Sequence, residues 1–147
     1  MRPLLGALKG RRILLPTIPG FDGTPHPDWP RSVPNLATVN LALLDILGIE
    51  EGLVVGNSVG GWIGAEMASR RPTRLAGLRL LDAVGLEPTA ETGDILNLLA
   101  FPPRERAHWS FHDPARFAPP PSPEALTRMA ANGRVLDGWL CRRPFHA

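Results

Sequence analysis

A serine set between two glycines, Gly56-Asn57-Ser58-Val59-Gly60, restricts the fold of this chain more than any other feature of its sequence. An apolar run at residues 53–55 precedes it, which is typical of a short buried strand. Residues 59–70 follow with a helical pattern that Pro72 stops. The sequence therefore predicts a tight strand–turn–helix unit with Ser58 exposed at the apex of the turn.

The rest of the chain predicts the same kind of architecture. Residues 11–18 and 75–82 are short apolar segments typical of buried strands, and residues 33–47 carry apolar residues at helical spacing. Ser32 is suited to cap that helix and Gly48 to end it. The order strand, helix, strand, helix, strand predicts a parallel sheet with right-handed crossovers. Further helices are predicted at residues 94–100 and, after Ser122, at residues 124–140.

The predicted turn suits nucleophilic chemistry at Ser58. A serine hydroxyl attacks only when it is exposed, has an adjacent base and has donors for the developing oxyanion. The helix that begins after Ser58 directs its first N–H groups and its positive dipole end at the site, so the N–H of Val59 is a natural oxyanion donor. Small residues next to the serine, Gly56 and Gly60, permit the strained turn. A P-loop is excluded because no Gly-Lys-Ser/Thr follows, and a dinucleotide-binding turn would want glycine in place of Ser58.

Composition excludes several other classes of protein. Of the 147 residues 44% are hydrophobic and 20% charged, as in ordinary globular domains. The net charge is +2 and the arginines are spread along the chain, which does not indicate a nucleic-acid surface. The single cysteine, Cys141, permits no internal disulfide. No run approaches the roughly 18 apolar residues of a membrane span. We therefore expect a cytoplasmic protein without a membrane span, and nothing in the sequence indicates an oligomeric state.

Over residues 10–90 the chain resembles the α/β-hydrolase superfamily. Residues 16–24 look like the loop after that family's fourth strand, residues 78–82 look like its sixth strand, and the turn looks like its nucleophile elbow. The elbow comprises Gly56, Asn57, Ser58, Val59, Gly60 and Gly61. The resemblance implies an α/β fold class: a partial α/β-hydrolase fold with a short parallel sheet of three strands and flanking helices. It places the partial core at residues 1–90 and the start of a helical cap at residues 91–147.

The resemblance also implies a function. The family would make this chain a serine hydrolase that cleaves an ester, an amide or an activated C–C bond in a small apolar, ester-like substrate. Ser58 would attack, the Val59 N–H would bind the oxyanion, and no metal or other cofactor would take part. The pattern G-N-S-x-G-G is similar to the elbow of C–C bond hydrolases that act on ring-cleavage products, and it also occurs in general esterases.

The partners of Ser58 are less clear from the sequence. In the family an acid and then a histidine follow the cap, so we expect a truncated protein with little activity of its own. Asp82 is either such an acid or a hydrogen-bond acceptor in a loop. His108 and His112 have the right chain order for a base, but residues 112–114 equally fit a turn. The alternative function is a non-catalytic hydrolase-fold module that binds a small apolar ligand or a partner chain.

A further expectation concerns the edges of the sheet. In the family, the third strand lies between the fourth and the fifth, and it is missing here if residues 1–10 are only the end of the helix before the fourth strand. Residues 13–15 and 53–55 must then either pair directly or leave unpaired strand edges, which favour aggregation.

Overall fold

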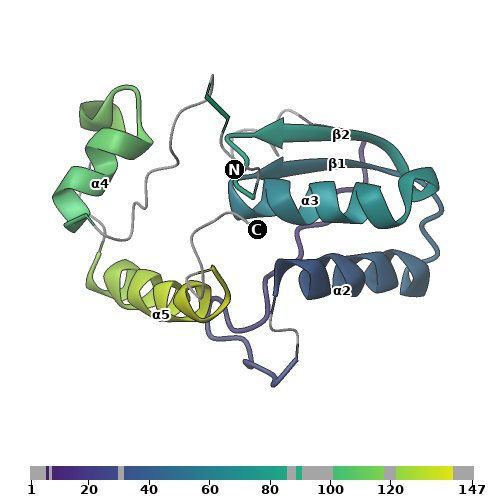
Figure 1. Cartoon of the computed structure of the whole chain (residues 1–147), viewed down its shortest axis with the longest axis horizontal. Coiled ribbons are helices and arrows are strands. Elements are labelled where there is room, and N and C mark those ends of the chain that lie inside the picture. Colours follow the sequence, from purple (N-terminus) through teal and green to yellow (C-terminus); the bar gives the residue numbers. More distant parts are fainter. Residues whose placement is uncertain are drawn as a thin grey trace.

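A computed structural model describes residues 6, 8–29, 32–85, 89, 90, 101–117 and 122–140 of the chain. Its longer elements and its short 3₁₀ helices follow one another along the chain as in Figure 1. They are α2 (Val33–Ile46), β1 (Gly52–Asn57), α3 (Val59–Arg70), η1 (Pro72–Arg74), β2 (Leu75–Leu81), α4 (Pro103–Ser110), η3 (Pro114–Phe117) and α5 (Pro123–Leu140).

The sheet consists of β1 and β2, which pair in parallel with Val54 opposite Leu78 and Asn57 opposite Leu81. Helix α3 connects the two strands and lies along one face of the sheet, with α2 on its far side (Figure 1). At Gly64 of α3 an added Cβ would lie 2.9 Å from Cδ1 of Leu78 and 3.1 Å from Cγ1 of Val54. The helix therefore approaches the sheet closely where it carries glycine, as its small residues predict. The α/β fold class, with a short parallel sheet and flanking helices, is confirmed.

The number of strands is smaller than predicted, because residues 11–18 form no strand. A strand needs a neighbour for its backbone hydrogen bonds, and the β ladder within the described residues joins only β1 and β2. Leu15, expected to be buried, is 56% exposed. Of the two alternatives for this segment, direct pairing with residues 53–55 is therefore wrong, and unpaired edges are what the structure shows.

The hydrophobic core lies mainly between α2 and α3. Its buried members are Val33, Leu36, Ala37 and Leu41 of α2 and Ile63 and Met67 of α3. Among the residues packed against them are Ile18 and Val54, which join the N-terminal segment and β1 to the same cluster. On β1, the residues that alternate with Val54 are exposed: Leu53 is 60% and Val55 48% exposed. Because side chains alternate between the faces of a strand, the sheet face away from α3 is uncovered in the described part of the chain.

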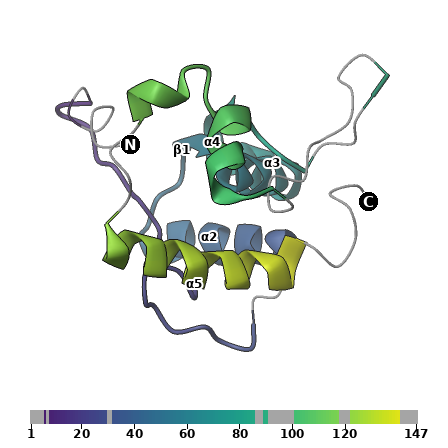
Figure 2. The ribbon, with the colours of Figure 1, turned by 90° about the vertical axis from the view of Figure 1, so that its left-hand side faces the viewer.

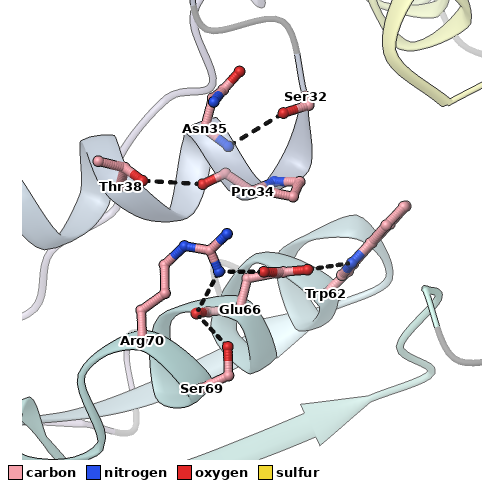
Figure 3. Close-up of polar contacts among 8 residues, drawn as sticks. All are labelled: Ser32, Pro34, Asn35, Thr38, Trp62, Glu66, Ser69 and Arg70. Carbon is pink, nitrogen blue, oxygen red and sulfur yellow. Dashed lines mark hydrogen bonds and ion pairs between the residues drawn. The ribbon is translucent and has the colours of Figure 1, made fainter. Parts of the chain in front are cut away.

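The ends of α2 are set by local interactions that the sequence predicts. The Ser32 hydroxyl oxygen accepts a hydrogen bond of 3.3 Å from the N–H of Asn35, and Pro34 occupies the first turn (Figure 3). Gly48 follows the helix with φ 63°, in the left-handed region that glycine adopts without strain. The predicted helix at residues 33–47 is therefore confirmed.

The helices after the sheet are α4 and α5. The predicted helix at residues 124–140 is confirmed as α5, and the Ser122 hydroxyl oxygen accepts from the N–H of Ala125 at 3.2 Å. No helix was predicted at the position of α4, which begins with Pro103, and the first residue of a helix tolerates proline. The predicted helix at residues 94–100 lies outside the described residues. None of the helices that the structure describes is long and apolar enough to cross a membrane.

Helix α5 is attached to the core through the loop before α2. The backbone N–H of Asp22 donates to Oδ1 of Asn132 at 3.1 Å, and Leu136 packs against the core. Both α4 and α5 lie on the side of the molecule where β1 and β2 end (Figure 1). Seen from that side, α5 passes in front of α2, and α4 in front of α3 (Figure 2). The helices expected to begin a cap thus stand at the end of the sheet that carries Ser58.

Candidate active site

Ser58 occupies a strained backbone conformation between β1 and α3. Its φ of 52° and ψ of −122° lie in a region that residues other than glycine rarely adopt. Its N–H donates to the carbonyl oxygen of Leu81 at 3.0 Å. Its own carbonyl oxygen accepts from the N–H groups of Gly61 at 2.9 Å and Trp62 at 3.3 Å. Such strain persists only where the surroundings fix the residue, and here both peptide groups that flank the Cα of Ser58 are held by hydrogen bonds.

Two glycines make this turn sterically possible, and one of them is not the expected one. At Gly56 an added Cβ would lie 2.3 Å from the carbonyl oxygen of Gly60 and 2.6 Å from Cα of Gly61, both backbone atoms. At Gly61 it would lie 2.5 Å from Cβ of Ala83. At Gly60, no heavy atom would lie within 4 Å. The expected need for a small residue is therefore right at Gly56 and wrong at Gly60. Gly60 contributes only its backbone to the close contact with Gly56.

The hydroxyl of Ser58 is placed at the N-terminus of α3. Ser58 is exposed and is the N-cap residue of the helix, yet its side chain makes no capping hydrogen bond. Val59 is the first helical residue, and its N–H is one of the donors for which a helix supplies no acceptor. The positive end of the helix dipole favours negative charge at this point. The arrangement thus presents a serine oxygen beside a donor suited to an oxyanion.

Asn57 and Asp82 lie, like Ser58, at the C-terminal ends of the two strands. Asn57 is opposite Leu81 in the register, and its Nδ2 donates to the Leu81 carbonyl oxygen at 3.1 Å. Asp82 directly follows β2 as Ser58 directly follows β1, and both are exposed with positive φ. No hydrogen bond within the described residues joins Asp82 to Ser58. The Asn57 side chain therefore links the ends of β1 and β2 by a hydrogen bond. The role of Asp82 stays a prediction.

None of the histidines that the structure describes is hydrogen-bonded to Ser58. His108 lies on α4, exposed, with its ring edge-on to Trp109 at 5.6 Å between centroids. His112 is exposed in the bend between α4 and η3. No hydrogen bond within the described residues connects either ring to Ser58. No group of three or more His, Cys, Asp or Glu residues in the described part of the chain is arranged to hold a metal ion.

Sequence reasoning missed the contribution of the segment after β2. The carbonyl oxygen of Leu81 and the N–H of Val84, which donates to the Ser58 carbonyl oxygen at 3.4 Å, both hold the elbow in place. These are backbone groups, so no side-chain pattern announces them. The local signal in the sequence is Gly85, since a glycine after a strand often marks a turn, and in the structure its φ is 89°.

The fold and the elbow define the class of protein. The family model described as alpha/beta hydrolase fold matches residues 1–105, and the chain belongs to this family. Over 77 residues it is 36% identical to a 2-hydroxymuconate semialdehyde hydrolase of Pseudomonas putida, a match that covers 52% of this chain and 27% of that protein. Over 82 residues it is 32% identical to a putative carbamate hydrolase, RutD, of Azorhizobium caulinodans, covering 55% of this chain and 31% of that protein. The matched stretch thus spans about three tenths of the length of these relatives.

Proposed function

We propose that Ser58 is the nucleophile of a serine hydrolase that cleaves an ester, an amide or an activated C–C bond. The observation that carries the proposal is the strained, exposed Ser58 at the N-terminus of α3, with its hydroxyl unused as a helix cap. Membership of the hydrolase fold family and two relatives named as hydrolases support it. Those names describe a semialdehyde and a carbamate as substrates of the relatives, and both compounds have a carbonyl group. A small carbonyl compound is the substrate class proposed here.

In this mechanism the Ser58 oxygen attacks the carbonyl carbon while a base removes the hydroxyl proton. The negative charge that develops on the carbonyl oxygen is stabilised by the N–H of Val59 and by the positive end of the α3 dipole. Collapse of the tetrahedral intermediate expels the leaving group with a proton and leaves an acyl group on Ser58. A water molecule then releases the acid. No step in this scheme requires a metal or another cofactor.

We further propose that the activating acid and histidine belong to parts of a longer hydrolase. In the described residues no histidine is hydrogen-bonded to Ser58, and the matched stretch covers 27% and 31% of the two relatives. The 147-residue chain should then react slowly at Ser58, because a serine without a base is a weak nucleophile.

A fluorophosphonate probe tests this proposal when the labelled residue is identified by peptide mapping. We expect slow labelling of Ser58 that added imidazole accelerates, because imidazole can enter the exposed site and act as the missing base. Ser69, an exposed serine on the same helix, is the matched internal control and should label far more slowly. Equal labelling of the two serines would refute Ser58 as nucleophile. Rapid labelling of Ser58 without imidazole, lost in Ser58→Ala, would instead show that the base lies within these 147 residues.

The alternative proposal is a non-catalytic module that binds a small apolar ligand or a partner chain. The exposed apolar residues on the uncovered sheet face, Leu53, Val55 and Leu81, favour it. A thermal-shift screen of apolar carboxylic esters and acids against the wild-type chain and Ser58→Ala separates the two functions. Stabilisation that is equal in both, together with no selective labelling of Ser58, would support the binding module.

A further inference from the structure

The indole ring of Trp62 lies directly against the backbone of Gly85. Trp62 lies near the start of α3. Gly85 is the last residue of the segment 82–85, which follows β2 and which we call the β2 turn. A Cβ added at Gly85 would lie 2.2 Å from Cδ2 and 2.3 Å from Cγ of the indole. Gly85 also has φ 89°. A larger residue at this position would therefore be strained and would displace the ring.

The β2 turn contacts the elbow at two points, and the last residue of β2 adds a third contact. The carbonyl oxygen of Leu81, just before the turn, accepts from the Ser58 N–H at 3.0 Å. The N–H of Val84 donates to the Ser58 carbonyl oxygen at 3.4 Å. Ala83 packs so closely on Gly61 that an added Cβ there would lie 2.5 Å from Cβ of Ala83. Any outward movement of the β2 turn therefore removes contacts that hold Ser58 in its strained conformation.

The indole also makes a hydrogen bond within α3. Its Nε1 donates to Oε1 of Glu66 at 3.4 Å, and Oε2 of Glu66 pairs with Nη1 of Arg70 at 2.5 Å (Figure 3). Each of these residues lies one helical turn beyond the last, so the three side chains form a ladder on one face of α3. An ion pair this exposed contributes little stability. The Trp62–Glu66–Arg70 ladder lies within α3 and orients the ring. The contact of Trp62 with the β2 turn is the one between the ring and Gly85.

We propose that Trp62 is a positioning residue that keeps the β2 turn against the elbow and so maintains the reactive conformation of Ser58. The role in reaction rests on the proposed function, since it presumes Ser58 as the nucleophile. The structural part does not, because the attachment of the β2 turn is measurable without any chemistry. Strained residues need such surroundings, since otherwise the backbone relaxes to an ordinary conformation.

Amide hydrogen exchange in the 147-residue chain tests the attachment. In Trp62→Ala the Ser58 and Val84 amides should exchange at least about tenfold faster relative to the Leu41 amide in α2. Because the partly buried Trp62 also packs against the core, the exchange of Leu41 should rise too, but by less. Trp62→Phe keeps a ring over Gly85 and should restore the slow exchange. Met67→Ala is the matched control, since Met67 is buried on the same helix and belongs to the core. It should speed all three amides in parallel.

Gly85→Ala gives an independent test, because its methyl group would clash with the Trp62 ring. This variant also tests the proposal if Trp62→Ala does not fold. It should loosen Ser58 and Val84 selectively as well. The proposal is overturned if these variants leave the exchange of Ser58 and Val84 in its wild-type ratio to Leu41, or change all three as Met67→Ala does. Fluorophosphonate labelling of Ser58 should fall about tenfold in Trp62→Ala and recover in Trp62→Phe. If wild-type Ser58 labels no faster than Ser69, the proposed function fails, and the exchange rates still decide the positioning role.

Discussion

The backbone N–H of Ser58 donates its hydrogen bond to the carbonyl oxygen of Leu81, at 3.0 Å, across the end of the sheet. Leu81 belongs to the neighbouring strand, and the same oxygen accepts a second hydrogen bond from the Asn57 side chain. The conformation of Ser58 is therefore set by β2 as much as by its own strand and helix. A residue held in this way can keep a strained backbone, and the strain reduces the stability of the chain.

Replacing Ser58 tests how much stability that strain costs. Ser58→Ala and Ser58→Gly both remove the hydroxyl, but only glycine adopts φ 52° freely. Strain of this kind costs about 1–3 kcal/mol, and the greater freedom of glycine in the unfolded chain offsets about 0.5–1 kcal/mol of the relief. We expect Ser58→Gly to be more stable than Ser58→Ala by about 1 kcal/mol in urea unfolding followed by circular dichroism. Equal stability of the two variants would show that the turn relaxes when the hydroxyl is absent.

The glycines on either side of Ser58 should respond in opposite ways to the same substitution. In Gly56→Ala the new methyl group meets backbone atoms of Gly60 and Gly61 that cannot rotate away, so we expect a loss of about 3 kcal/mol or more. In Gly60→Ala the methyl group enters open space in the first turn of α3, so we expect no loss and a gain of at most about 1 kcal/mol. Urea midpoints of the two variants measure the difference. A Gly60→Ala variant less stable than Gly56→Ala would contradict the geometry of the turn.

Local signals in the sequence predict most of the elements, and what they miss depends on distant neighbours. The ends of α2 are specified by Ser32 and Gly48, and those of α3 by the elbow and Pro72, so these helices are found within a residue or two. Residues 11–18 have the composition of a strand, but a strand also needs a partner, which composition cannot supply. In the same way the motif identifies Ser58 but not the carbonyl of Leu81 or the ring of Trp62, because those contacts arise only when β2 and α3 come together.

The absence of a strand at residues 11–18 has a consequence that mutation can measure. Leu15→Glu places a charge on a side chain that is already 56% exposed, and we expect the free energy of unfolding to change by less than about 0.5 kcal/mol. The matched control is Leu36→Glu in α2, where the side chain is 1% exposed. A buried unpaired carboxylate costs several kcal/mol, so that variant should not fold. Circular dichroism of both purified variants provides the comparison, and unfolding of Leu15→Glu would show that the segment is buried in solution.

The start of α5 should depend on pH through Glu124. A hydrogen bond with the Ser122 side chain, and then one with its own backbone N–H, lower the pKa of the Glu124 carboxyl, and Arg128 adds a smaller effect of the same sign. A group whose pKa is lower in the folded state stabilises that state above its ordinary pKa and loses this contribution as the pH falls through the lowered value. We therefore expect the helical signal at 222 nm to fall more steeply in acid for the wild-type chain than for Glu124→Gln, which has no carboxylate to protonate. Glu50→Gln, an exposed residue outside the helices, is the control for the loss of one charge and should keep the wild-type slope. A Glu124→Gln curve that follows the wild type throughout the acid range would show that the carboxylate does not support the helix.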